Sequence, residues 1–220
     1  MTLSKRLQII HDMINYDAVV ADVGSDHGQL MIALFESKRI SHGYAIENKN
    51  GPYNRLVKAL EKEGIEEHIV PLFSDGISDL PPKVDTVVLA GMGGRLIINI
   101  LKSHKEKLKN VQTIIVDAHS CIAKVREEIS QLGYIIADEK MVKEDNIFYE
   151  IIKFYKADVA FYSEKDLEFG PILVSEKPAT FKEKYESRIK EINHLLEEKD
   201  LPLSRINELK REREKIEGVL

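Results

Sequence analysis

The chain has 220 residues, of which 43% are apolar and 31% are charged, and its net charge is −5 at pH 7. This composition indicates a soluble globular protein with one core and an appendage, and it argues against general electrostatic adhesion to nucleic acid, though not against a local basic patch. The single cysteine excludes a disulfide framework, and no stretch reaches membrane-spanning length, so we expect a cytoplasmic protein.

Helical and strand periodicities alternate along the first part of the chain. Helical spacing of apolar residues predicts helices at 3–15, 28–38, 50–64, from about 94 to 108, and 121–133. Short apolar runs between them predict strands, some with a following turn, at 17–23, 42–47, 67–77, 84–94 and 111–120. The alternation is typical of a parallel sheet covered by helices.

The alternation of strands and helices ends after residue 133. Residues 134–145 and 146–157 are two strand-like runs joined by a turn at Glu144-Asp145-Asn146, which predicts a β-hairpin. Five β-α alternations closed by a hairpin predict an α/β fold: a Rossmann-like, mostly parallel sheet with one antiparallel strand near its edge. That is the class I methyltransferase arrangement, whereas a dehydrogenase would be expected to continue with further β-α units.

The composition shifts again near residue 157. We expect a methyltransferase domain at 1–156 and, at 157–220, a connector followed by a C-terminal helical hairpin broken at Asp200-Leu201-Pro202. A narrow, coiled-coil-like apolar seam would join its two charged helices, with the members Phe181, Tyr185, Ile189, Ile192, Leu196, Leu203, Ile206, Leu209 and Ile216.

The loop after the first strand suits a ligand without phosphates. It reads Gly24-Ser25-Asp26-His27-Gly28, so Asp26 occupies a position where the pyrophosphate-binding G-x-G-x-x-G motif requires glycine. A carboxylate there would repel a pyrophosphate, so the loop differs from that of a dinucleotide-binding protein.

The other strand ends carry acids and glycines as well. Glu47 ends the second strand, where it can accept hydrogen bonds from ribose hydroxyls, and Asp75-Gly76 follows the third, where the acid can receive an adenine amino group. Gly91-Met92-Gly93-Gly94 follows the fourth and would face the reacting centre. S-adenosylmethionine fits these ends, since its cationic sulfonium tolerates Asp22 or Asp26 nearby and it carries no phosphate.

Several motifs resemble one bacterial family. They are "LSKRL" at 3–7, "ADVGSDHG" at 21–28, "NGP" at 50–52, "SDGI" at 74–77, "AGMGG" at 90–94, "EDNIFYEII" at 144–152 and "FGP" at 169–171. They resemble the tRNA (adenine-N1)-methyltransferases that modify adenine 22 of tRNA (the TrmK family). The resemblance covers nearly the whole chain and implies methyl transfer from S-adenosylmethionine to N1 of a D-arm adenine.

The resemblance also implies site residues. The cofactor-binding roles would fall to Asp22, Gly24, Ser25, Asp26, His27, Glu47, Asp75, Gly76, Ala90, Gly91, Met92 and Gly93. One departure concerns the substrate side: Asp117-Ala118-His119 stands where the family typically has Gln-Pro-Asn.

Methylation of adenine N1 needs no preceding base, because N1 carries an in-plane lone pair; correct placement supplies most of the catalysis. No residue is a certain catalyst, and Met92, His27 and His119 are the candidates around the target base, which must first be exposed, as by flipping. The histidines lack metal-ligand spacing, so we expect no metal site, and we expect a monomer. Candidate tRNA contacts are Arg95, Lys102, Lys105, Arg205, Lys210 and Arg211.

The residues do not exclude two other functions. One is a nicotinamide-dependent oxidoreductase, against which the missing second glycine and the closing hairpin both count. The other is a non-catalytic protein that binds S-adenosylmethionine or docks a partner on its helical hairpin, which the departure at Asp117-Ala118-His119 keeps possible.

Overall fold

The computed structural model describes residues 2–158, 161–198 and 200–220. Its strands are β1 (Val20–Val23), β2 (Gly43–Glu47), β3 (Ile69–Phe73), β4 (Thr86–Met92), β5 (Thr113–Ala118), β6 (Tyr134–Glu144) and β7 (Ile147–Lys156). Its helices are α1 (Lys5–Met13), α2 (Gln29–Glu36), α3 (Asn50–Glu63), α4 (Gly94–Ser103), the 3₁₀ helix η1 (Lys105–Lys109), α5 (Ile122–Gln131), α6 (Glu164–Phe169), α7 (Pro171–Glu176), α8 (Ala179–Leu196) and α9 (Leu203–Glu217). Within the described residues, none of these helices is both long and apolar enough to cross a membrane.

All seven strands form one sheet in the order β3-β2-β1-β4-β5-β7-β6. β7 alone runs opposite to the other six strands, and the sequence predicts one such antiparallel strand near the edge of the sheet. Asp145 and Asn146 form the hairpin turn with φ of 49° and 62°, the positive values that a two-residue turn between twisted strands requires. The hairpin therefore inserts its second strand between β5 and β6.

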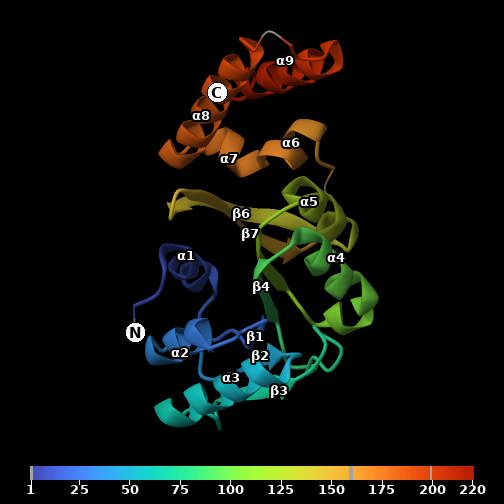
Figure 1. Cartoon of the computed structure of the whole chain (residues 1–220). Helices are drawn as coiled ribbons and strands as arrows, with labels where there is room; N and C mark the ends of the chain where they lie inside the picture. The colour runs from blue at the N-terminus through green and yellow to red at the C-terminus, as the bar shows by residue number, and fades with distance from the viewer. Residues whose placement is uncertain (1, 159–160, 199) are drawn as a thin grey trace.

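Helices cover both faces of the sheet (Figure 1). Side chains alternate along each strand, so that Val87 and Leu89 of β4 pack with α4 and α5, while Val88 packs with α1, α2 and α3 on the other face. This double burial explains the nearly continuous apolar runs of the central strands.

The connector after residue 157 contains two short helices that the sequence analysis did not separate. Ser163 and Asp166 form a reciprocal capping box at the start of α6, and Pro171 occupies the first turn of α7. Gly170 lies between the two helices with φ of 84°, a value that favours glycine.

The C-terminal helices α8 and α9 lie at one end of the molecule, beyond β6, with α6 and α7 between (Figure 1). The predicted seam is present at Phe181, Ile192 and Leu209, but Leu203 is 73% exposed and is not part of it. The seam is also broader than a coiled coil, because Met141 of β6 and Leu173 of α7 belong to the same buried cluster. The hairpin therefore packs against the sheet and its connector as well as against itself.

A buried ion network reinforces this contact. The fully buried guanidinium of Arg126 in α5 donates to Glu139 Oε1 of β6 at 2.8 Å and to Glu150 Oε2 of β7 at 2.6 Å. The second oxygen of Glu150 accepts from Lys184 Nζ of α8 at 2.6 Å. The network therefore links α8 of the C-terminal hairpin to the sheet. Removing any one partner would leave a buried charge without a counter-charge, so the link should be costly to break.

We predict that Gly170→Ala destabilises the protein through this network. An added Cβ would lie 2.6 Å from Glu139 Oε1 and 2.7 Å from Arg126 Nη2. Gly133→Ala is the matched control, since Gly133 has a similar φ of 87° but only Ala157 O, at 4.0 Å, within reach of a Cβ. Urea unfolding should show a loss of about 3 kcal/mol for Gly170→Ala and about 1 kcal/mol for the control. Equal losses would contradict the role given to the network.

Candidate functional site

The loop between β1 and α2 is built by two glycines and a set of backbone hydrogen bonds. Gly24 and Gly28 have φ of 78° and 66°, and Gly28 caps α2. The amides of Gly24 and Ser25 both donate to the carbonyl of Ile46 in β2, at 2.9 and 3.2 Å. Val23, the last residue of β1, pairs with Ile46 of β2, and the loop that follows β1 is hydrogen-bonded to the same Ile46. The chain therefore turns tightly at the end of β1.

Asp22 lies buried beneath this loop and is 6% exposed. Its Oδ2 accepts from Ser25 Oγ at 2.6 Å, and no Lys, Arg or His of the described residues forms an ion pair with it. Burial raises the pKa of Asp22 to about 6; the Ser25 hydroxyl opposes this rise and the nearby Glu47 charge adds to it. A cationic ligand would therefore find an uncompensated carboxylate here.

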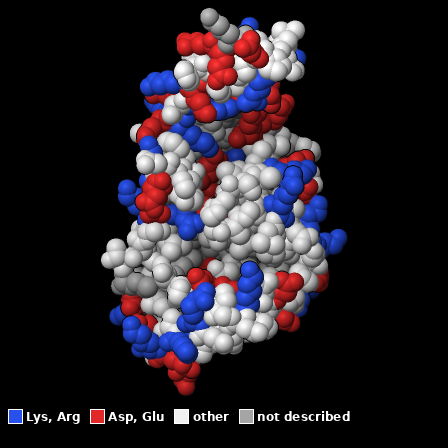
Figure 2. All heavy atoms as spheres, in the orientation of Figure 1, with Lys and Arg blue, Asp and Glu red and all other residues white. Residues whose placement is uncertain are grey.

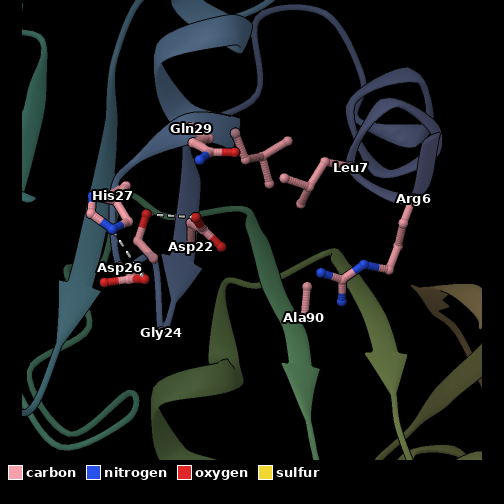
Figure 3. Close-up of a pocket in the computed structure, with 10 residues that line it drawn as sticks. Arg6, Leu7, Asp22, Gly24, Asp26, His27, Gln29 and Ala90 are labelled. Atoms are coloured by element: carbon pink, nitrogen blue, oxygen red, sulfur yellow. Dashed lines mark hydrogen bonds and ion pairs between the residues drawn. The ribbon is translucent and has the colours of Figure 1, made fainter. Parts of the chain in front are cut away.

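Glu47 ends β2 and is 7% exposed. Its Oε1 accepts from the backbone amide of Asp26 at 2.7 Å. Asp26 itself, with φ of 44°, pairs with Arg55 of α3 at 2.8 Å, and His27 Nε2 lies 3.6 Å from its other oxygen. Asp22 and Glu47 thus line the interior of the site, whereas the half-exposed side chains of Asp26 and His27 lie together at its rim (Figure 3).

Two adjoining hollows follow the strand ends. A cavity of about 200 Å³ is lined by residues that include Arg6, Asp22, Ser25 and Ala90. A smaller one, of about 80 Å³, is lined by residues that include Glu47, Asp75, Gly76 and Met92, and Gly24 borders both. Most of the predicted strand-end residues therefore line two hollows that meet at Gly24, whereas Gly91 and Gly93 line neither.

The walls of the smaller hollow are closely packed. Asn48 Nδ2 donates to Asp75 Oδ1 at 3.1 Å, which orients that carboxylate. Gly76 has φ of 59°, and a Cβ there would lie 2.8 Å from Ile100 Cγ2, so only glycine fits.

The glycine turn after β4 carries a bulge. The register with β5 shifts between Ala90 and Met92, and Gly91 has φ of 76°. Gly93 has an ordinary φ of −67° and room for a Cβ, whereas a Cβ on Gly94 would overlap the Ser120 carbonyl and Val125. Close packing in this turn therefore falls on Gly94, which the sequence pattern could not distinguish from Gly93.

Sequence reasoning missed Arg6 as a site residue. Arg6 reaches from α1 over the sheet edge, where its Nη1 donates to Oδ2 of the buried Asp117 at 2.6 Å. Burial raises the pKa of Asp117, and the charge and hydrogen bond of Arg6 oppose the rise. His119 follows β5 and packs edge-on against Tyr149 of β7, with ring centroids 5.8 Å apart. The "LSKRL" stretch that contains Arg6 was the available signal.

The basic candidates are dispersed. Arg95 is exposed beside the glycine turn, but Lys102 lies at the other end of α4 and pairs with Glu128 at 2.6 Å, and Lys105 follows it in η1. Arg205 pairs with Glu208 at 2.6 Å, while Lys210 and Arg211 are exposed on α9 and form no ion pair among the described residues. Acidic and basic side chains intermingle over the C-terminal helices (Figure 2).

Metal ligation has no evident place in the described part of the chain. No group of three or more His, Cys, Asp or Glu side chains there is arranged to hold a metal ion.

The strand order, the antiparallel β7 and the acids and glycines at the carboxyl ends define a class I methyltransferase fold. Residues 20–218 match the family model for tRNA (adenine(22)-N(1))-methyltransferase, TrmK. The chain belongs to this family.

Individual relatives agree with this assignment. Over an alignment 210 positions long, the chain is 30% identical to the Bacillus subtilis tRNA (adenine(22)-N(1))-methyltransferase; the alignment covers 90% of this chain and 86% of that protein. The crystal structure of Streptococcus pneumoniae Sp1610 in complex with S-adenosyl-L-methionine covers 100% of both chains with a TM-score of 0.91 and 31% identity. The structure of M. capricolum TrmK in complex with S-adenosyl-homocysteine matches with a TM-score of 0.87 at 25% identity, over 99% of this chain and 97% of that one.

We predict that Asp22→Asn stabilises the ligand-free protein at pH 7.5. The folded-state pKa of Asp22, about 6, lies above the ordinary value of 3.8 for an aspartate, so ionisation of this buried carboxyl opposes folding increasingly between those two pH values and fully above pH 6. Asparagine keeps the acceptor for Ser25 and removes the charge. Thermal unfolding should occur about 3 °C or more higher at pH 7.5, with the gain shrinking towards pH 4. An increase in unfolding temperature that did not change with pH would show that the ionisation of Asp22 is not its cause.

Proposed function

We propose that this chain transfers the methyl group of S-adenosylmethionine to N1 of adenine 22 in tRNA. The observation that carries the proposal is membership of the tRNA (adenine(22)-N(1))-methyltransferase family over residues 20–218. The antiparallel β7 inside the sheet argues against the nicotinamide-dependent alternative, whose fold continues with parallel units.

The chemistry of the strand-end residues fits S-adenosylmethionine. Glu47 would accept from the ribose hydroxyls, and Asp75 would accept from the adenine amino group. Asp22, buried and without a cationic partner among the described residues, would face the positive methionine end of the cofactor. The backbone of the Gly24 loop and of residues 90–93 would enclose the centre of the ligand.

Placement would do most of the catalytic work. When bound, S-adenosylmethionine supplies an electrophilic methyl group on a sulfonium. Adenine N1 brings its own lone pair, so the chain needs to hold the base in line with that methyl and to exclude water. Met92, on the bulged turn beside Gly24, would pack against the reacting centre, and His27 would support the loop at its rim.

The C-terminal region would contribute RNA contacts. In the proposed division, residues 1–156 hold the cofactor and residues 157–220 extend the surface that meets the folded tRNA. The exposed Lys210 and Arg211 on α9 suit phosphate contacts that do not depend on base sequence.

The decisive experiment is incubation with unfractionated tRNA and methyl-labelled S-adenosylmethionine, followed by nucleoside analysis. We expect label in N1-methyladenosine, and none when the adenine at position 22 of a tRNA transcript is replaced by another base. Cofactor binding without transfer would favour the non-catalytic alternative, and binding of NADH alone would favour an oxidoreductase.

We predict that Glu47→Gln weakens S-adenosylmethionine binding about 10- to 100-fold, since a charged hydrogen-bond acceptor contributes roughly 1.5–3 kcal/mol. Glu61→Gln, on the exposed face of α3, is the matched control and should bind as the wild type does. Isothermal titration calorimetry measures both. Unchanged affinity of Glu47→Gln would place the ribose elsewhere.

We further predict that reversing the charge of Lys210 and Arg211 together, to glutamate, lowers tRNA affinity about tenfold and flattens its salt dependence, with S-adenosylmethionine affinity unchanged. The matched control reverses Lys58 and Lys62, both exposed on α3 near the opposite end of the molecule (Figure 1). Filter binding at several salt concentrations tests this; equal losses for the two pairs would argue against an RNA surface on α9.

A further inference from the structure

The contact between α1 and the end of β5 has no place in cofactor binding as described above. Asp117 is completely buried, and its Oδ2 accepts from Arg6 Nη1 at 2.6 Å. Arg6 remains 22% exposed along its side chain, so one end of the pair is buried in the sheet edge while the other reaches the surface. Such an arrangement holds a cation at a defined point.

The guanidinium of Arg6 has neighbours on several sides. Its Cζ lies 5.1 Å from the centre of the Tyr149 ring, and a Cβ on Gly91 would come within 3.3 Å of Nη1. His119 Nε2 lies 3.4 Å from the same Nη1, a contact in which the imidazole nitrogen accepts. These neighbours confine the planar group above the bulged turn of β4.

Arg6 also lines the larger cavity together with Asp22 and Ala90 (Figure 3). The cavity therefore has the cofactor loop on one side and the Arg6 side chain on another. A base brought to the methyl group through this opening would meet the guanidinium and the aromatic pair of Tyr149 and His119.

Resting on the function proposed above, we propose that Arg6 contacts the target adenine and that Asp117 is the positioning residue that holds Arg6 for this contact. A guanidinium plane stacks on a base and its N–H edge donates to ring nitrogens, and the neighbouring Tyr149 ring extends the same stacking surface.

The charge of the methylated product explains why an arginine paired with a carboxylate suits a position beside the target base better than an unpaired arginine does. Methyl transfer to N1 leaves a positive charge on the adenine ring, which an uncompensated guanidinium nearby would oppose. The carboxylate of Asp117, in direct contact with Arg6, offsets that repulsion. Arg6 can then orient the base without disfavouring the cationic product.

The test compares Arg6→Lys and Asp117→Asn with the wild type. Lysine keeps the charge but not the planar fork, and asparagine keeps the shape of the aspartate but not its charge. Arg39→Lys is the matched control, because Arg39 also lies over a tyrosine, 4.5 Å from the Tyr16 ring centre, on the segment that precedes β2, away from the strand ends that form the site.

Single-turnover methylation of tRNA at saturating labelled S-adenosylmethionine and saturating tRNA gives the rate of the chemical step. We expect both variants to lose about 10- to 100-fold in this rate, as a displaced reactant does, with the dissociation constants of cofactor and tRNA within about threefold of the wild type. Arg39→Lys should keep the wild-type rate. Circular dichroism checks that each variant is folded.

Three results would overturn the proposal: a rate for Arg6→Lys within twofold of the wild type, a loss equal to that of Arg39→Lys, or a loss in Arg6→Lys that disappears when the S-adenosylmethionine concentration is raised further. If Asp117→Asn does not fold, Tyr149→Leu replaces it, and a wild-type rate in that variant counts against the stacking surface. Failure of the wild-type protein to methylate tRNA would instead reject the proposed function, so the two failures are distinguishable.

Discussion

The arrangement of the C-terminal half depends on the ion pairs and hydrogen bonds of one buried side chain, Arg126. It joins α5 to both strands of the closing hairpin through Glu139 and Glu150, and it donates to the Leu167 carbonyl at the end of α6. Glu139 also accepts from the backbone amide of Ile172 in α7, and Glu150 from Lys184 in α8. A single buried cation thus connects the sheet to every later helix except α9, which packs on α8.

The buried carboxylates of this network have cationic partners in the described chain, whereas Asp22 and Glu47 at the strand ends do not. In the network both oxygens of each glutamate have partners, so the buried charges are neutralised within the protein. At the strand ends, Asp22 and Glu47 are almost as deeply buried but form no ion pair within the described chain. The cost of burying Asp22, evident in its raised pKa, is what a cationic cofactor would relieve.

Helix α1 completes the site, although it precedes the first strand. The amide of Lys5 donates to Glu144 at the tip of β6, and Lys153 of β7 donates to the Met13 carbonyl at the other end of the helix. Both ends of α1 are therefore attached to the closing hairpin, which places Arg6 over β5. The hairpin that distinguishes this fold from a dehydrogenase also carries the helix that borders the proposed substrate side.

The sequence by itself determined the sheet type, the antiparallel strand, the acids at the ends of β1, β2 and β3, and the hairpin turn, which it placed at Glu144-Asp145-Asn146 and the structure narrows to Asp145-Asn146. These features follow from local patterns, because periodicity and turn residues act over a few neighbours, and parallel strands must present their carboxyl ends at one edge. The exposure of Leu203 and the choice of Gly94 over Gly93 for close packing were decided only in three dimensions, by which neighbours approach each backbone position. The same holds for the contacts of Arg6 with Asp117 and of Arg126 with Glu139 and Glu150, since they join residues 13 to 111 positions apart and no local pattern specifies such partners.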